Sequence, residues 1–278
     1  MNFLVLLLVL WIEKFSAWRT HIQQDGPWLR LLAWTERQAD FIESPWLAVI
    51  VLVGLPLLGL GLVLALLQPF AYGWLALPVH LLVLIYSLGR GDLQAALGPF
   101  RDSWRRSDSE AAYLVARRDL ALEADDEGAL LQQVQRYLVW QAYQSFFAVI
   151  FWYALLGPMA ALAYRLLALM AEHAEQAAFR ERAVALRHAF DWLPVRVLAA
   201  SFALVGNFVA VNRALLHELL SWDISAAQLV TNVGRAASET PEPVIGEDGV
   251  SSLDGLWQLL VRAAVLWYAV FALWTLFY

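Results

Sequence analysis

The sequence predicts an all-α polytopic membrane protein with four or five transmembrane helices and helical cytoplasmic segments between them. Hydrophobic residues make up 61% of the 278 residues and charged residues only 16%, whereas soluble domains hold roughly 45–50% and about 25%. Several apolar stretches also approach or exceed the ~20 residues that cross a bilayer as a helix. An apolar solvent explains both observations.

The first segment, 1–45, is predicted to hold an apolar helix followed by a cytoplasmic stretch. Residues 3–12 are uninterruptedly apolar but reach only about half of the ~20 residues needed to cross. A secretory signal would need a basic start and a small-residue cleavage site, yet Glu13 and Lys14 stand where that site would be. The helix is therefore expected to be retained, as a buried or interfacial element.

A transmembrane helical hairpin is predicted at 46–88. Residues 46–67 and 70–88 carry no charge and are joined only by Gln68 and Pro69, so the two helices must run antiparallel. Pro56, like Pro78 and Pro158, lies in an apolar stretch. Proline is tolerated there when neighbouring helices satisfy the freed carbonyl, which favours a packed bundle.

The hairpin places its flanking segments, 13–45 and 89–145, on the same side of the membrane. Both carry basic residues, and the loop between the helices carries none. The positive-inside rule predicts that both segments are cytoplasmic. Within the second, Asp108 is predicted to cap a helix. The acids that follow predict a solvated turn, and they are Glu123, Asp125, Asp126 and Glu127.

The remainder is predicted to form a transmembrane helix at 146–170, a mixed segment at 171–256 and a C-terminal transmembrane helix at 257–278. Within the mixed segment, 192–212 is apolar apart from one Arg. It either crosses, which gives five spans, or lies along the surface as an amphipathic helix, which gives four. Residues 234–255 are predicted to be a mobile acidic loop.

Two arginines in apolar stretches, Arg165 and Arg196, point to a candidate binding site. A charge inside a membrane helix is costly and usually faces a partner or a cavity, although snorkelling to headgroups is an alternative. Asp191 is predicted to cap a helix that has Pro194 in its first turn. We expect these residues and Tyr164 to line an anion pocket, with supporting side chains at Trp152, His188 and Glu13.

Composition also excludes several functions. The chain has no cysteine and a net charge of −6, which rules out thiolate metal sites and argues against a nucleic-acid partner. No H-E-x-x-H, P-loop or G-x-S-x-G motif occurs. The sequence therefore predicts no metal and no cofactor, points to membrane lipids as partners, and identifies neither a catalytic residue nor an oligomeric state.

The run F-W-Y-A-L-L-G-P at 151–158, the Tyr164-Arg165 pair, the block D-W-L-P-V-R at 191–196 and Gly206 resemble the AmpE family. The pattern W-I-E-K-F at 11–15 matches as well, so the resemblance covers nearly the whole chain. It implies an inner-membrane protein of Gram-negative bacteria, associated with the cytosolic AmpD amidase of cell-wall recycling and with β-lactamase induction.

The same blocks are more distantly similar to the CobD/CbiB enzymes of cobalamin assembly. That resemblance would imply a ligase-like reaction whose acids hold Mg²⁺ beside phosphates. The departures lie at the positions where the enzymes carry their acidic and amide residues: this chain has Trp140, Gln141, Gln144, Ala168, Leu169, Met170, Ala171, Glu172, Arg187 and His188 there. The enzymes' Asn corresponds to Asp191. The resemblance thus implies a shared scaffold without the synthase residues.

Two functions from different classes follow. The preferred one is a non-catalytic inner-membrane regulatory protein linked to cell-wall recycling and β-lactamase induction. The alternative is a membrane enzyme or a binder of an anion or lipid-linked substrate on the CobD/CbiB-like scaffold.

Overall fold

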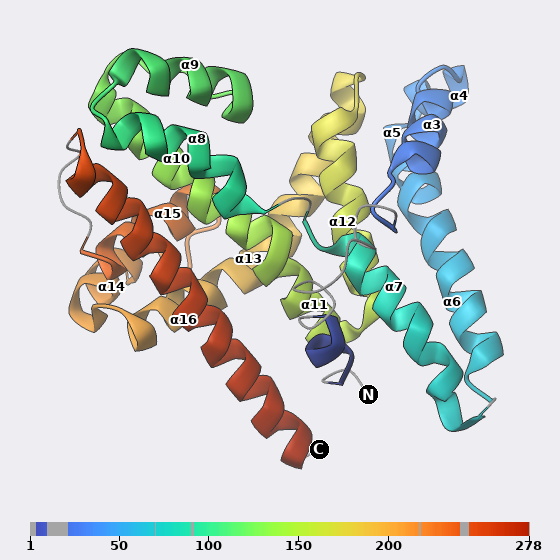
Figure 1. Ribbon diagram of the computed structural model, residues 1–278. Helices are drawn as coiled ribbons and strands as arrows, with labels where there is room; N and C mark the ends of the chain where they lie inside the picture. Colours follow the sequence, from blue (N-terminus) through green and yellow to red (C-terminus); the bar gives the residue numbers. More distant parts are fainter. Residues whose placement is uncertain are drawn as a thin grey trace. The chain divides into compact units, whose positions relative to one another are not determined.

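The computed structural model describes residues 4–9, 22–69, 71–89, 92–216, 218–239 and 245–277, and every regular element within these ranges is helical. Among the described residues, four helices are long and apolar enough to cross a membrane: Pro45–Leu67, Glu127–Leu156, Ala177–Val205 and Glu247–Thr275. These observations confirm the predicted all-α polytopic membrane fold. The chain divides into two compact units, whose helices are labelled in Figure 1.

Unit 1 comprises Met1–Arg90 and Ala148–Asp191. Its elements are α3 (Gly26–Thr35), α4 (Ala39–Glu43), α5 (Pro45–Val49), the π-helix η1 (Ile50–Gly54), α6 (Leu55–Leu67), the 3₁₀ helix η2 (Ala71–Ala76), α7 (Leu77–Ser87), α11 (Ala148–Leu156), α12 (Pro158–His173) and the first part of α13 (Ala177–Val205). Helix α12 packs against α6, α7 and α11 and is the centre of this unit.

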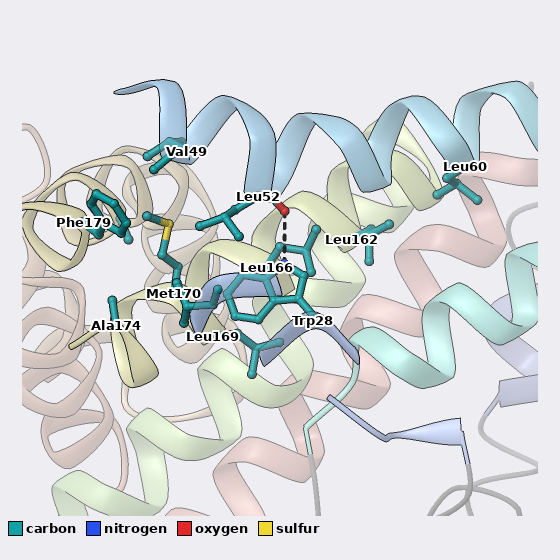
Figure 2. Packing of buried hydrophobic residues seen from close by; sticks show 13 residues of the cluster. Trp28, Val49, Leu52, Leu60, Leu162, Leu166, Leu169, Met170, Ala174 and Phe179 are labelled. Carbon is teal, nitrogen blue, oxygen red and sulfur yellow. Dashed lines mark hydrogen bonds between the residues drawn. The ribbon is translucent and has the colours of Figure 1, made fainter. Parts of the chain in front are cut away.

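The core of unit 1 is an apolar cluster built from α3, the first predicted span and α12–α13. Figure 2 shows the cluster around Trp28, Leu52 and Leu166. The indole Nε1 of Trp28 donates a hydrogen bond of 3.1 Å to the carbonyl of Leu52. Leu52 lies in the π-helix η1, and Pro56, whose position would pair with this carbonyl in an α-helix, has no N–H. The expectation that a neighbouring helix satisfies the freed carbonyl is confirmed here.

The second arm of the predicted hairpin is shorter than the first. Within 71–89 the chain forms η2 and then α7, and the apolar helix Trp74–Ser87 falls short of the length that crosses a membrane on its own. The end of α7 is held by Gln23, whose side-chain amide donates to the carbonyls of Ile85 and Leu88 at 2.8 and 3.0 Å. These carbonyls belong to the last turn, where partners within the helix are missing.

The predicted span 146–170 is divided into two helices. Gly157 has a positive φ of 78° and precedes Pro158, the first residue of α12. Glycine adopts this conformation without steric cost, and proline is readily accommodated where a helix begins. The long apolar helix of this region is instead Glu127–Leu156, so residues 127–145, predicted to be cytoplasmic, belong to a helix long enough to cross.

Unit 2 comprises Gly91–Phe147 and Trp192–Tyr278. Its elements are α8 (Leu93–Arg105), α9 (Ser109–Leu120), α10 (Glu127–Ala142), the π-helix η3 (Tyr143–Phe147), the second part of α13, α14 (Phe208–Leu215), α15 (Ala226–Ala237) and α16 (Glu247–Phe277). Asp108 caps α9 by accepting from the backbone N–H of Ala111 at 3.0 Å, as predicted. The acidic turn ends at Asp126, which caps α10.

Two local expectations were wrong. Asp191 does not cap a helix, because α13 runs unbroken through it with Pro194 inside the helix. The region 234–255 is mostly helical: α15 extends to Ala237 and α16 begins at Glu247. The apolar segment 192–212 is split, since α13 ends at Val205 and α14 begins at Phe208.

Candidate functional site

A buried polar contact joins α12 and α13 within unit 1. The hydroxyl of Tyr164 donates to Oδ1 of Asp191 at 2.9 Å, and both side chains are buried. The sequence predicted that these two residues belong to one site, and the structure brings them together. A hydrogen bond to a buried carboxylate stabilises its charged form.

Arg187 completes this contact from one turn earlier on α13. Its Nε lies 3.7 Å from Oδ2 of Asp191, and its Nη1 lies 3.8 Å from Oε1 of Glu172 on α12. Its guanidinium also lies over the ring of Tyr164, 5.8 Å from the centroid, where the π-face attracts a cation. We call Tyr164, Glu172, Arg187 and Asp191 the charge network.

The two ends of the charge network differ in exposure. The side chain of Asp191 is 4% exposed and that of Arg187 11%, but that of Glu172 is 42% exposed. The arginine therefore bridges one carboxylate inside the unit and one at its surface.

Arg165 takes part in a separate ion pair with the N-terminal part of unit 1. Its Nη2 lies 3.2 Å from Oδ2 of Asp25, and both side chains are largely buried. Asp25 directly precedes α3 and stands two residues after Gln23, which holds the end of α7. The stretch 23–25 thus fastens both α7 and α12.

Arg196 belongs to unit 2 and finds its acceptors on the backbone. Its Nη1 donates to the carbonyl of Trp192 at 2.7 Å, its Nε to that of Leu219 at 2.5 Å, and its Nη2 to that of Ser221. The guanidinium also lies 4.2 Å from the centroid of the Trp192 ring. This arginine stabilises the chain between α14 and α15.

The remaining predicted residues are placed as follows. Trp152 packs against Phe190, with ring centroids 5.1 Å apart, and its buried Nε1 has no hydrogen-bond acceptor in the described part of the chain. His188 is half-buried next to Arg187, and Pro194 is buried within α13. Glu13, and with it the pattern at 11–15, lies outside the described residues.

The predicted site did not include three residues of these ion pairs: Asp25, Glu172 and Arg187. One signal was present, because Arg187 and Asp191 stand four residues apart and such pairs face each other on a helix. The two arginines of these ion pairs offset two of the three carboxylate charges, and the third carboxylate, Glu172, is 42% exposed to solvent. What this arrangement can do is hold α12 against α3 and α13 through charges that are costly to separate.

Across the described ranges, no group of three or more His, Cys, Asp or Glu side chains is arranged to hold a metal ion. Residues 1–242 match the sequence profile of the family described as "Regulatory signalling modulator protein AmpE". The chain belongs to the AmpE family. AmpE members are thus classed as regulatory signalling modulators, and the matched range contains both Arg165 and the whole charge network.

A curated AmpE relative supports the assignment. The chain is 24% identical to Protein AmpE of Shigella flexneri over 250 residues, which cover 84% of this chain and 85% of the relative. No solved structure matches the chain.

Proposed function

We propose that this AmpE protein is an inner-membrane regulator that links cell-wall recycling to β-lactamase induction. We further propose that a contact within the charge network opens when the protein responds to a signal. The observation that carries the proposal is the position of Arg187, held between the inner carboxylate of Asp191 and the outer carboxylate of Glu172. The family description supports the regulatory class.

The two ion pairs of Arg187 differ in how easily they can be broken. Arg187 and Asp191 lie on the same helix, so their pair persists when α12 moves. The contact with Glu172 joins two helices and lies at the surface of the unit. An incoming charge can compete for Glu172, whereas withdrawing Asp191 would take from the buried Arg187 its inner carboxylate, at a cost of about 3–5 kcal/mol. The Glu172 contact is therefore the one a signal would open.

The test uses a strain that lacks its own copy and carries an inducible β-lactamase. Wild type, Glu172→Gln and the control Glu181→Gln are returned on the chromosome, and β-lactamase activity is measured before and after a β-lactam. Glu181 is exposed on α13, the helix that carries Arg187. We expect Glu172→Gln to change the induction ratio at equal membrane abundance and Glu181→Gln to leave it unchanged. Equal ratios for all three would refute the proposal.

We further propose that segment 13–45 and the part of segment 89–145 that precedes the candidate span Glu127–Leu156 face the cytoplasm, on the basis of the positive-inside rule. The chain has no cysteine, so single-cysteine variants report without interference. Gln68→Cys, in the connection after α6, should react with an impermeant maleimide in cells whose outer membrane alone is permeabilised. Asp125→Cys, in the acidic turn, should react only after the inner membrane is opened. The reverse pattern would invert the orientation.

We infer the cytosolic AmpD amidase as the functional partner, on the association that the resemblance to the AmpE family implies. The test is epistasis: if this chain acts through the amidase, the Glu172→Gln effect on induction disappears in a strain without the amidase. Persistence of the effect would place the chain in a separate route.

The alternative, an anion or lipid-linked-substrate binder, is favoured by one observation. The Nε of Arg165 is buried and has no hydrogen-bond acceptor in the described part of the chain, so one donor of this arginine remains for a ligand. Native mass spectrometry of the purified protein, compared with Arg165→Met, tests it. A co-purified anion that is lost in the variant supports binding, and identical spectra without added mass oppose it.

A further inference from the structure

The segment 208–222 of unit 2 exposes apolar side chains, and its helix is too short to cross a membrane. Helix α14 has eight residues, about 12 Å of helix at 1.5 Å per residue. Val209, Leu220 and Trp222 are 66%, 82% and 53% exposed, and Phe208 and Leu216 are exposed as well. Burial in the protein accounts for the opposite face, where Val211 and Leu215 are buried.

We propose that α14 and the loop that follows it form a surface that inserts into the headgroup boundary of the lipid bilayer. We call this surface, Phe208, Val209, Leu216, Leu220 and Trp222, the apolar ledge. Its composition fits that depth. Asn212 and Arg213 are exposed on the same helix, and tryptophan and arginine side chains are both typical of the boundary between water and acyl chains.

The backbone of the loop supports the same depth. Non-helical backbone is not tolerated against lipid in the hydrocarbon core, where its carbonyls would lack partners. Arg196 donates to the carbonyls of Leu219 and Ser221, which flank Leu220. These bonds lower the cost of moving this loop out of bulk water, because two of its acceptors are already satisfied. The loop exposes leucine and tryptophan while Arg196 pairs with its carbonyls. This combination is better explained by contact with lipid than by a turn exposed to water.

The ledge also continues a surface that is itself suited to lipid. Helix α13 is one of the candidate spans, and in its second half Val197 and Leu204 are exposed. Trp222 stacks at 6.3 Å on Trp192 of α13. The ledge thus contacts a candidate span that itself exposes apolar side chains. A second copy of the chain is the competing occupant, and the experiment separates the two.

The test is electron paramagnetic resonance on the full chain in bilayers of anionic and zwitterionic phospholipid. Spin labels are placed one at a time at Val209→Cys and Leu220→Cys. Leu58→Cys on α6, 77% exposed within a candidate span, is the lipid reference, and Asp125→Cys is the water reference. Collision rates with oxygen, which concentrates in lipid, and with a water-soluble nickel chelate give the depth of each label.

We expect both ledge labels to collide more often with oxygen than with the nickel chelate, as the Leu58 label does, but at a shallower depth. The Asp125 label should collide more often with the nickel chelate. Ledge labels that collide more often with the nickel chelate, like the Asp125 label, would overturn the proposal. Labels shielded from both reagents, with dipolar broadening between copies, would also overturn it in favour of a protein partner. Two independent label positions guard against a local disturbance at either one.

Discussion

The indole Nε1–H of Trp28 donates to the carbonyl of Leu52, 24 residues later in the chain, at 3.1 Å. Pro56, four residues after Leu52, has no N–H to offer this carbonyl, and the indole supplies a donor from another helix. The bond links α3 to the first candidate span, and it makes the proline acceptable in an otherwise apolar helix. The relationship can be measured because each partner can be changed on its own.

We expect Trp28→Phe to lower the free energy of unfolding by about 1–3 kcal/mol, since it keeps a ring but leaves a buried carbonyl unsatisfied. In a Pro56→Ala background, residue 56 supplies the missing N–H, and the same substitution should cost less. Equilibrium unfolding in mixed micelles of the four variants of this cycle measures the coupling. Equal costs in both backgrounds would show that the indole acts through packing alone.

The two carboxylates of the charge network should differ in their effect on stability. Asp191→Ala leaves the buried Arg187 without its inner partner, so we expect a loss of about 3–5 kcal/mol. Glu172→Gln removes a partner that is 42% exposed, and its loss should stay within about 1 kcal/mol. Tyr164→Phe should fall between them, at about 1.5–3 kcal/mol, because it removes a hydrogen bond to a charged group. Thermal unfolding of the purified variants ranks the three.

The pair Arg165 and Asp25 is expected to depend on both partners. Arg165→Met alone removes the arginine that pairs with the buried carboxylate of Asp25 and should destabilise by about 3–5 kcal/mol, whereas the double variant with Asp25→Asn should recover part of the loss. The exposed pair of Arg117 and Glu123, at 3.0 Å, is the control, and Arg117→Met should cost no more than about 1 kcal/mol. A double variant worse than Arg165→Met would contradict a specific pair.

Gly206 is expected to be a sensitive position in unit 2. A Cβ there would lie 2.7 Å from the carbonyl oxygen of Ala237 and 3.0 Å from its Cβ, so Gly206→Ala should destabilise by about 1–3 kcal/mol. Gly255 lies in α16 with nothing within 4 Å of an added Cβ. Gly255→Ala should be neutral or stabilise by up to about 1 kcal/mol. The comparison uses the same unfolding measurement for both variants.

Arg196 should control the loop of the apolar ledge. Arg196→Met keeps an unbranched apolar side chain but removes the bonds to the carbonyls of Leu219 and Ser221. The spectrum of a spin label at Leu220→Cys should then show faster motion, whereas a label at Val209→Cys, on the helix, should change little. Unchanged mobility at both sites would mean that the loop is held by packing rather than by this arginine.

The sequence predicted what depends on local spacing. Asp108 was recognisable as a cap because its acceptor serves an N–H only three residues ahead. Pro56 implied a partner, but it could not name Trp28, because the partner depends on how distant helices pack. The prediction that Asp191 caps a helix was wrong, because it took Pro194 to be a residue of the first turn. In the structure α13 instead continues past Pro194, at the expense of one backbone bond to Phe190.

The candidate site shows the same limit. Tyr164 and Asp191 were rightly placed together, but the partner of Arg165 proved to be Asp25, 140 residues earlier. Nothing in the neighbourhood of Asp25 in the sequence indicates a buried acid. Long-range ion pairs of this kind follow from the register of packed helices, which hydrophobic patterning alone does not specify.

The start of α13 carries information about how the chain is made. Oε1 of Glu36 accepts from the backbone N–H groups of Glu175 and Gln176, at 2.7 and 3.0 Å, and Glu36 precedes Glu175 by 139 residues. A ribosome that adds about 5–20 residues each second needs about 7–28 s to synthesise the intervening chain. During that interval Glu36 has been synthesised and its acceptor is still unoccupied. The first helices of unit 1 therefore cannot complete their packing until the second half of their own unit emerges.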